Sequence, residues 1–359
     1  MISLFATTAL LSACTDDPDT ARRPEAEPEP GVRQDAAELT AEQAASFVAA
    51  VRQLQTTPSP GDESISWYAS FVEWHRQAFS CELARGPVGA AHNSPLFLPW
   101  HREFLLRYEN ALQQVSGDPT VRLPYWDWTD DESTAAVFSS ALMGGEGDPA
   151  EGYAVMDGPF AKGTYELTVL DPEVVQEAIA PQTSHLVRRF GVMPGGATMP
   201  LPTSAEVLAA LEVDRYDDAP WDATADPQHS FRNHIEGWDE ALPPDCSNGW
   251  QNISEHAGGA HNLHNGVHMW VGGLWADDDG AMHGGTMLYN TSPNDPVFFL
   301  HHANIDRLWA EWQERHGTPF PAVAAGYTPD STMWPWFDRT IGSLESTLDL
   351  GYRYDTTDM

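Results

Sequence analysis

Two histidines four residues apart stand in the stretch HNLHNGVHMW, which runs from position 261 to 270. On a helix, His264 and His268 project from one face about one turn apart, so both can bind the same metal ion. His261, three residues before His264, is an alternative member of the pair. No glutamate lies between the two histidines, so the zinc-protease arrangement with its built-in general base is absent. The spacing indicates a metal site but does not identify the metal.

Two adjacent histidines stand in a second stretch, DPVFFLHHANIDRLW. Asp295 followed by Pro296 predicts a helix start, with a carboxylate at the N-cap and proline at the first helical position. His301 and His302 then point to different parts of the helix surface, and periodicity does not choose between them. Asp306 lies one turn after His302 and could orient its imidazole, which mildly favours His302 as the functional residue.

Three further histidines stand in the N-terminal half. His101 lies on a predicted helix whose Leu105 and Tyr108 continue the same face inward, and His92 precedes it by nine residues in a loop. His75 lies among aromatic residues on another predicted helix. Each is expected to be buried, either as a hydrogen-bonded core residue or as a ligand. Taken singly, such histidines are more often structural than functional.

Helical periodicity is clear in the segments that must position these histidines. The predicted helices cover residues 39–54, 66–79, 100–115, 262–270 and 296–316. Connections rich in glycine and proline lie between them, and strand signals are few and short. The simplest interpretation is one mainly helical domain with long loops.

The chain of 359 residues is strongly acidic, with 53 acidic and 18 basic side chains, a formal net charge of −35 and Lys162 as its only lysine. Such a surface repels phosphate backbones and anionic lipids. Nucleic-acid binding is therefore not expected.

The N-terminal stretch ends an apolar run in Leu-Ser-Ala-Cys, which resembles a bacterial lipoprotein signal with Cys14 as the lipidated residue. The run is too short to span a bilayer, and an apolar terminus with an incidental cysteine is the alternative. We expect a signal peptide at 1–14, an acidic, proline-rich disordered tether at 15–38 and a single domain at 39–359. The protein would then be exported and held on the outer side of a bacterial membrane, at the periplasm or cell surface, through the lipid alone.

Two longer motifs resemble the copper signatures of the tyrosinase family. The first, H-x4-FLPWHR-x2-L-x3-E, runs from His92 to Glu109, and the second, DP-x-FF-x2-H-x3-D, from Asp295 to Asp306, is shared with hemocyanins. They occur in the family's order, and the resemblance extends from about Leu39 to the C-terminus through LPYWDWT, HNGVHMWVGG, MWPWFD and LGYRYD. It implies a mainly α fold with a four-helix-bundle core around a type 3 dinuclear copper site, long loops and little β structure.

The resemblance also implies the ligands, with His301 as a neighbour only. It assigns His75, His92 and His101 to one copper ion and His264, His268 and His302 to the other. Neutral imidazoles suit copper in both oxidation states. A di-iron bundle would require Glu-x-x-His motifs, and none is placed to complete such a site. Two copper ions as cofactors and O2 as co-substrate follow from the resemblance.

Hydroxylation of monophenols is linked in this family to an asparagine after the first ligand of the second copper and to an upstream glutamate, which together hold a water. Asn265 matches the asparagine. Glu236, in FRNHIEGW, is favoured as the glutamate and implies an inserted loop from position 239 to about 260. Glu255, nine residues before His264, is the alternative, and either could be an ordinary solvated carboxylate. With such a pair, the chain is expected to hydroxylate at least some monophenols.

Other positions follow from the same resemblance. Phe298 is expected to pack over the second copper, and Tyr289 either covers the substrate entrance or is an ordinary loop residue. Ala90 stands where fungal and molluscan members often carry a cysteine joined to a ligand, so His92 is expected to be unmodified. The chain stops soon after GYRYD, so no C-terminal shield over the site is expected.

Cys81 and Cys246 remain after Cys14, and in an exported protein they are expected to form a disulfide. Two buried thiols are the alternative.

The predicted function is a copper oxidase that converts phenols and catechols to o-quinones. The alternatives are a hemocyanin-like oxygen carrier and a zinc hydrolase that uses His264, His268 and a third histidine. A small phenolic or o-aminophenolic substrate fits the oxidase. The sequence predicts neither the natural substrate nor the oligomeric state.

Overall fold

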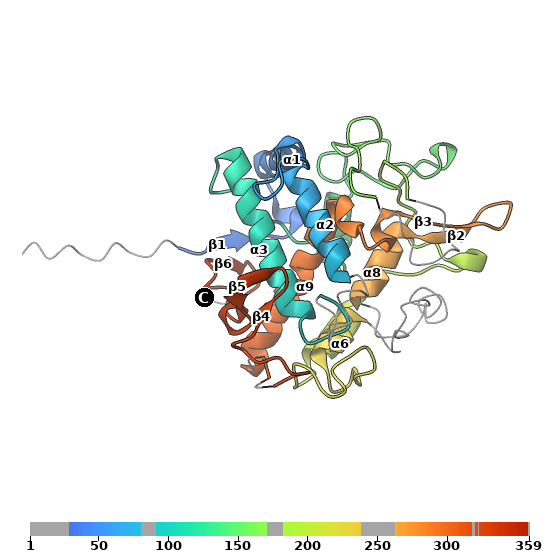
Figure 1. The fold of residues 1–359 in the computed structure, drawn as a ribbon. Helices are drawn as coiled ribbons and strands as arrows, with labels where there is room; N and C mark the ends of the chain where they lie inside the picture. The colour runs from blue at the N-terminus through green and yellow to red at the C-terminus, as the bar shows by residue number, and fades with distance from the viewer. Residues whose placement is uncertain are drawn as a thin grey trace, which may run out of the picture.

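The computed structural model describes residues 29–79, 91–170, 182–237, 263–317, 320–321 and 323–357. Its longer helices are α1 (Ala41–Thr56), α2 (Trp67–Phe79), α3 (Phe97–Ser116), α8 (Leu263–Gly272) and α9 (Val297–His316). Helix α1 packs against α2 and α3, and α9 packs against α3 and α8 (Figure 1). The five predicted helical segments and the mainly helical fold are confirmed, with helix ends that differ from the prediction by a few residues.

Helix α1 shows how the sequence sets a boundary and a buried face. Thr40 accepts a hydrogen bond from the backbone of Gln43, whose side chain accepts one from the backbone N–H of Thr40, and this capping box begins the helix. The apolar residues of the helix recur at helical spacing and are buried against α2 and α3: Phe47, Ala50, Val51 and Leu54.

Helices α3 and α9 form the centre of the core and are buried over most of their surface. Tyr108 of α3 stacks on Phe299 of α9 with a centroid distance of 3.5 Å. Each helix ends at a left-handed glycine, Gly117 or Gly317, a conformation that a side chain would strain. The two helices bring the two motifs of the sequence side by side.

Shorter elements surround these helices. Shorter α-helices of the described residues are α4 (Asp131–Val137), α5 (Ser204–Leu211) and α6 (Phe231–Glu236). The 3-10 helices are η1 (Ala36–Glu38), η3 (Pro149–Glu151), η4 (Pro194–Gly196), η5 (Thr286–Leu288), η6 (Ser292–Asn294) and η7 (Gly342–Leu344). In the described ranges, six short strands form three two-stranded sheets: β1 (Gly31–Arg33) with β6 (Tyr352–Tyr354), β2 (Leu274–Ala276) with β3 (Met282–Gly284), and β4 (Thr332–Met333) with β5 (Trp336–Thr340).

The predicted tether is wrong at its C-terminal end, because residues 31–38 are part of the fold. Strand β1 pairs in parallel with β6, so the two ends of the described chain lie together (Figure 1). Arg33 is fully buried, forms ion pairs with Glu109 and Asp306, and lies 3.7 Å from the ring centroid of Tyr352. The composition of this segment gave no sign that it is folded, because it contains few apolar residues. Its order comes from one buried cation, Arg33, which binds distant residues. The folded domain begins before Leu39.

The start of α9 also differs from the prediction by one position. The helix begins at Val297 with Pro296 as its N-cap, while Asp295 pairs with Arg188 and still accepts a hydrogen bond from the backbone N–H of Val297 at 3.1 Å. The carboxylate therefore supports the helix start from one residue further out.

None of the helices in the described part of the chain combines the length and the apolar character needed to cross a bilayer. The predicted signal peptide, including Cys14, lies outside the described residues, as do Cys81, Ala90 and Cys246.

Candidate metal centre

Seven histidines of the described residues gather in two groups inside the molecule. The first group is His75, His92 and His101, and the second is His264, His268, His301 and His302. Within each group, one ring nitrogen from every member lies within 4.8 Å of the others. The two groups adjoin, since the rings of His101 and His302 stack with a centroid distance of 4.3 Å.

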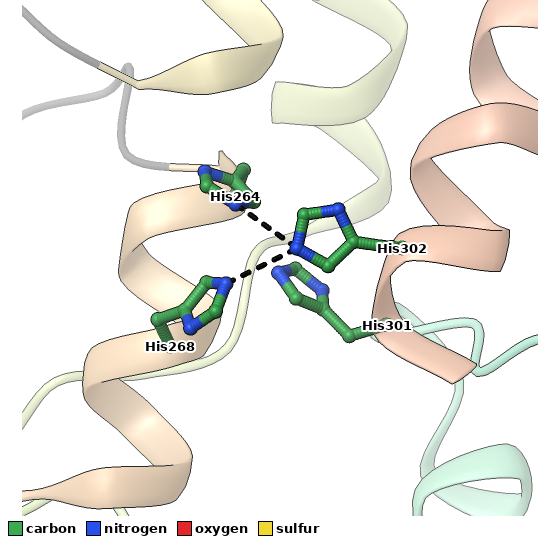
Figure 2. Close-up of side chains that lie close together, drawn as sticks. All are labelled: His264, His268, His301 and His302. Atoms are coloured by element: carbon green, nitrogen blue, oxygen red, sulfur yellow. Dashed lines mark hydrogen bonds between the residues drawn. The ribbon is translucent and has the colours of Figure 1, made fainter. Parts of the chain in front are cut away.

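Four helices present most of these side chains. Helix α2 carries His75, α3 carries His101, and His92 lies in the turn before α3. Helix α8 carries the i, i+4 pair and α9 carries the adjacent pair, and Figure 2 shows the four rings of the second group facing one another across these two helices. The separate motifs of the sequence are thus brought into one region.

Main-chain carbonyls orient four of the imidazoles. In each case Nδ1 lies near an oxygen: Asn290 O for His75 (2.7 Å), Phe97 O for His101 (2.8 Å), Met287 O for His268 (2.8 Å) and Glu236 O for His264 (3.3 Å). Because a carbonyl only accepts, Nδ1 carries the proton and the Nε2 lone pair is the atom left to bind a metal.

Nitrogen separations in the second group fit a shared ion. Nε2 of His302 lies 3.3 Å from Nε2 of His264 and 3.3 Å from Nε2 of His268, as the dashed lines of Figure 2 show. Imidazole nitrogens lie about 3.3–3.4 Å apart when they share one ion at about 2.0–2.1 Å in a tetrahedral arrangement. In the first group, Nε2 of His101 is buried without a hydrogen-bond partner among the described residues. An acceptor lone pair buried in this way is well suited to a metal ligand.

Burial keeps these histidines neutral. Desolvation lowers the pKa of His75 to about 3 and of His268 to about 4. It also lowers the pKa of the other five well below the ordinary value, and neighbouring histidines add to the effect. Metal binding requires neutral imidazole, so the groups need not lose a proton near neutral pH before they bind.

His301 lies closer to the centre than the sequence indicated. Its ring stacks on His264 with a centroid distance of 5.2 Å and an interplanar angle of 10°, and it lies 5.2 Å from the ring of Trp128. In Figure 2, the contacts of His264 and His268 converge on His302 instead. This geometry favours His302 as the third ligand.

Asp306 does not orient His302. Its carboxylate accepts hydrogen bonds from two arginines and two tyrosines, Arg102 (2.5 Å), Arg33 (3.3 Å), Tyr352 (2.6 Å) and Tyr354 (2.7 Å). Nδ1 of His302 is buried and has no hydrogen-bond partner in the part of the chain that the structure describes. The expectation drawn from the one-turn spacing is wrong, because Arg102 and Arg33 compete more strongly for the carboxylate than a neutral imidazole does.

Phe298 lies between the two groups. Its ring stacks on His302 at 4.0 Å and lies 4.9 Å from the ring of His75. Tyr289 is buried beside η5 and lines a small cavity together with Trp275 and His283.

Glu236 ends α6 and is fully buried. Its carboxylate accepts hydrogen bonds from the backbone N–H of Asn93 at 2.6 Å and from Arg232 at 3.1 Å, and its backbone oxygen receives Nδ1 of His264. Burial raises its pKa to about 7, although Arg232 opposes this shift. Since Asn93 follows His92, Glu236 contacts the surroundings of both groups.

Asn265, buried on α8, donates from Nδ2 to the backbone oxygen of Gly237 at 3.1 Å. It therefore lies beside the end of α6 that carries Glu236. The alternative residues Glu255 and His261, and the predicted inserted loop, lie outside the described residues.

Sequence reasoning missed several residues that support the site. The carbonyls of Met287 and Asn290 are main-chain groups and leave no signal in side-chain type. Arg232 did leave one, because it stands four residues before Glu236 at the spacing of a helical ion pair.

Comparisons with known proteins agree with this geometry. Residues 64–315 match the family model described as the common central domain of tyrosinase. A tyrosinase of Streptomyces lincolnensis is 40% identical over 322 residues, which cover 87% of this chain and 95% of that protein. Grixazone synthase of Streptomyces griseus is 36% identical over 333 residues, with coverage of 87% and 95%.

Among solved structures, a polyphenol oxidase of Thermothelomyces thermophila has a similar fold, with a TM-score of 0.58, 24% identity and coverage of 91% of this chain and 89% of the other. The family match, the coverage of the bacterial relatives and the two histidine groups lead to one conclusion. This chain belongs to the tyrosinase family and is a dinuclear copper oxidase that acts on phenols.

Proposed function

We propose that this oxidase hydroxylates at least some monophenols in addition to oxidising catechols to o-quinones. The observation that carries the proposal is the placement of Glu236, whose side chain binds Asn93 beside one histidine group while its backbone binds His264 of the other. Asn265, which donates to the carbonyl of Gly237, the residue after Glu236, would be the second member of the pair.

The two copper ions would be held by six histidines, with O2 as co-substrate. The proposed ligands are His75, His92 and His101 for one ion and His264, His268 and His302 for the other. Bound copper supplies the redox chemistry with O2. We also infer that α2, α3, α8 and α9 form the four-helix core around the ions, since each carries at least one of these ligands.

Glu236 and Asn265 would together hold the water through which the substrate loses its proton. A monophenol has a pKa of about 10 and must lose its proton before it can bind a metal through oxygen, whereas a catechol needs less help. Nδ2 of Asn265 is used by Gly237, which leaves the amide oxygen to accept a hydrogen bond from a water. A water held between that oxygen and the Glu236 carboxylate would pass the phenol proton to the carboxylate.

Phe298, stacked on His302, would form the apolar floor against which a phenol ring packs. Tyr289 is the candidate for the residue over the entrance, supported by its place next to Asn290, which orients His75. Small phenols, o-aminophenols and peptidyl tyrosine remain candidate substrates.

The test compares a monophenol, a catechol and an o-aminophenol on copper-loaded protein. Glu236→Gln should lower monophenol turnover by about 100-fold or more, the range of general acid–base contributions, and catechol turnover by much less. The matched control is Glu103→Gln, since Glu103 is also a buried carboxyl with a raised pKa and an arginine partner, Arg107. It should leave the ratio of the two rates unchanged. If the native protein oxidises catechol briskly but never a monophenol, even after priming with a trace of diphenol, the proposed role of Glu236 is wrong.

A further inference from the structure

One short segment orients a histidine in each group. The segment Thr286–Asp295, here called the carbonyl loop, contains η5 and η6 and lies between β3 and α9. The carbonyl of Met287 accepts from Nδ1 of His268, and that of Asn290, three residues later, accepts from Nδ1 of His75. A displacement of this loop would therefore change the orientation of one proposed ligand in each copper site.

Hydrogen-bonded turns follow one another along the carbonyl loop. Backbone hydrogen bonds run from Ser292 to Tyr289 at 2.8 Å and from Asp295 to Ser292 at 2.9 Å, and η5 precedes them. Tyr289 belongs to both turns, because its N–H donates to the carbonyl of Thr286 at 3.5 Å and its own carbonyl accepts from Ser292, so a shift of the Met287 carbonyl is passed to Asn290 through this residue.

Two buried tyrosines fix the loop from one side. The hydroxyl of Tyr68 on α2 donates to the carbonyl of Pro293 at 2.6 Å, and that of Tyr165 donates to the carbonyl of Asn294 at 2.9 Å. Both hydroxyls bind main-chain oxygen, so each holds the path of the backbone and not merely a side chain. Tyr68 lies on the helix that also carries His75.

The two ends of the loop are fixed as well. At its start, Thr286 exchanges two hydrogen bonds with the backbone of Val187, at 2.8 and 2.9 Å. At its end, Arg188 binds both carboxylate oxygens of Asp295 at 2.7 Å, and Asp295 supports the first turn of α9. Three proposed ligands, His75, His268 and His302, thus depend on the same ten residues.

We propose that the carbonyl loop couples the two copper sites, so that binding of one ion raises the affinity for the second. The anchors hold the start and the last three residues of the loop, whereas Met287 and Asn290 lie between them and face the histidines. An ion bound to His75 restrains Asn290 through the Nδ1 hydrogen bond, and through Tyr289 it also restrains Met287 and pre-orients His268. The first ion then bears part of the free-energy cost of ordering the loop for the second ion. The second ion therefore binds more tightly, which is positive cooperativity. The inference rests on the six-histidine assignment given above.

The test counts copper ions per chain during loading. Copper-free protein is titrated anaerobically with Cu(I) in a competing chelator, and native mass spectrometry resolves chains with no, one or two ions. At half saturation the native chain should populate mainly the empty and the two-copper forms. In the Tyr68→Phe/Tyr165→Phe variant the one-copper form should rise to about half or more, as expected of independent sites.

Tyr108→Phe is the matched control. Tyr108 is a third buried tyrosine of the same core, but its hydroxyl has no hydrogen-bond partner among the described residues. Removal of this hydroxyl should leave the populations of chains with no, one and two copper ions as they are in the native chain. The thermal midpoint of each copper-free variant is recorded, and the single variants Tyr68→Phe and Tyr165→Phe replace the double variant if that fails to fold.

The outcomes separate the coupling from the ligand assignment. If the native chain loads two ions independently, or if the tyrosine variants load as cooperatively as the native chain, the coupling is refuted while the ligands stand. If the native chain binds fewer than two ions under all conditions, the ligand assignment itself is wrong.

Discussion

At the scale of single residues, adjacent histidines on α9 are expected to differ sharply in function. His302→Ala removes the nitrogen on which His264 and His268 converge, so copper content should fall from two ions to about one per chain, with loss of activity. His301→Ala removes a ring that stacks on His264 and should retain two ions. Elemental analysis of purified, copper-loaded protein measures both. The reverse pattern would show that His301 is the ligand.

At the scale of elements, the junction between the carbonyl loop and α9 depends on one buried ion pair. Arg188 and Asp295 are both fully buried, so Arg188→Met leaves a carboxylate without its cation and should destabilise the protein by about 3–5 kcal/mol. Urea unfolding of the copper-free protein measures this effect.

Two comparison variants test the reason for that loss. Arg215→Met removes an ion pair with Asp218 that is largely exposed to solvent, and it should cost at most about 1 kcal/mol. Arg188→Met/Asp295→Asn should be more stable than Arg188→Met alone, because no buried charge is left unpaired. A double variant that is less stable than the single one would contradict this explanation.

At the scale of the whole molecule, one carboxylate joins both ends of the described chain to its central helices. Asp306 of α9 binds Arg102 of α3, Arg33 of β1 and both tyrosines of β6. Burial acts to raise the pKa of Asp306, but Arg102, Arg33 and the two hydroxyls outweigh it and lower the pKa below the ordinary value. The folded protein therefore binds the Asp306 proton less readily than the unfolded chain does.

This shift predicts acid sensitivity with a definite sign. Stability from Asp306 is complete above the ordinary carboxyl pKa of about 4 and is lost as the pH falls through the lower pKa of the folded state. Asp306→Asn should be less stable at neutral pH and should show a weaker loss of stability below about pH 4. Unfolding curves of the copper-free protein between about pH 2.5 and 7 measure both effects. Asp338→Asn, at an exposed partner of Arg107, should follow the native curve.

A prediction about the location of the protein also belongs to this scale. The N-terminal motif predicts a lipid on Cys14, so Cys14→Ala should release the protein from membranes or block its maturation. Fractionation of expressing bacteria, with detection of the protein by antibody, measures this. Unchanged soluble protein in the cytoplasm, with Cys81 and Cys246 reduced, would count against both the export and the disulfide predictions.

Much of the helical framework could be predicted from the sequence, because its signals are local. Helix α1 has its capping residues and apolar stripe within one segment, and the His264/His268 spacing is meaningful as soon as the helix is recognised. The two copper motifs likewise combine ligand, helix and neighbouring residues over fewer than twenty positions each. Such patterns depend on backbone periodicity and are visible without knowledge of any distant residue.

Contacts between segments that are distant in the sequence depend on the tertiary fold and could not be predicted from local patterns. Arg33 and Tyr354 are 321 positions apart, and the order of β1 depends on that meeting and not on its own composition. Asp306 had a plausible local partner in His302, but the tertiary fold brought two arginines to it. The carbonyls of Met287 and Asn290 are chemically the same as those of any other residue. The sequence by itself therefore indicated which histidines are candidate ligands, and only the folded backbone decided which oxygens orient them, because a main-chain oxygen is recognised by its position and not by its residue type.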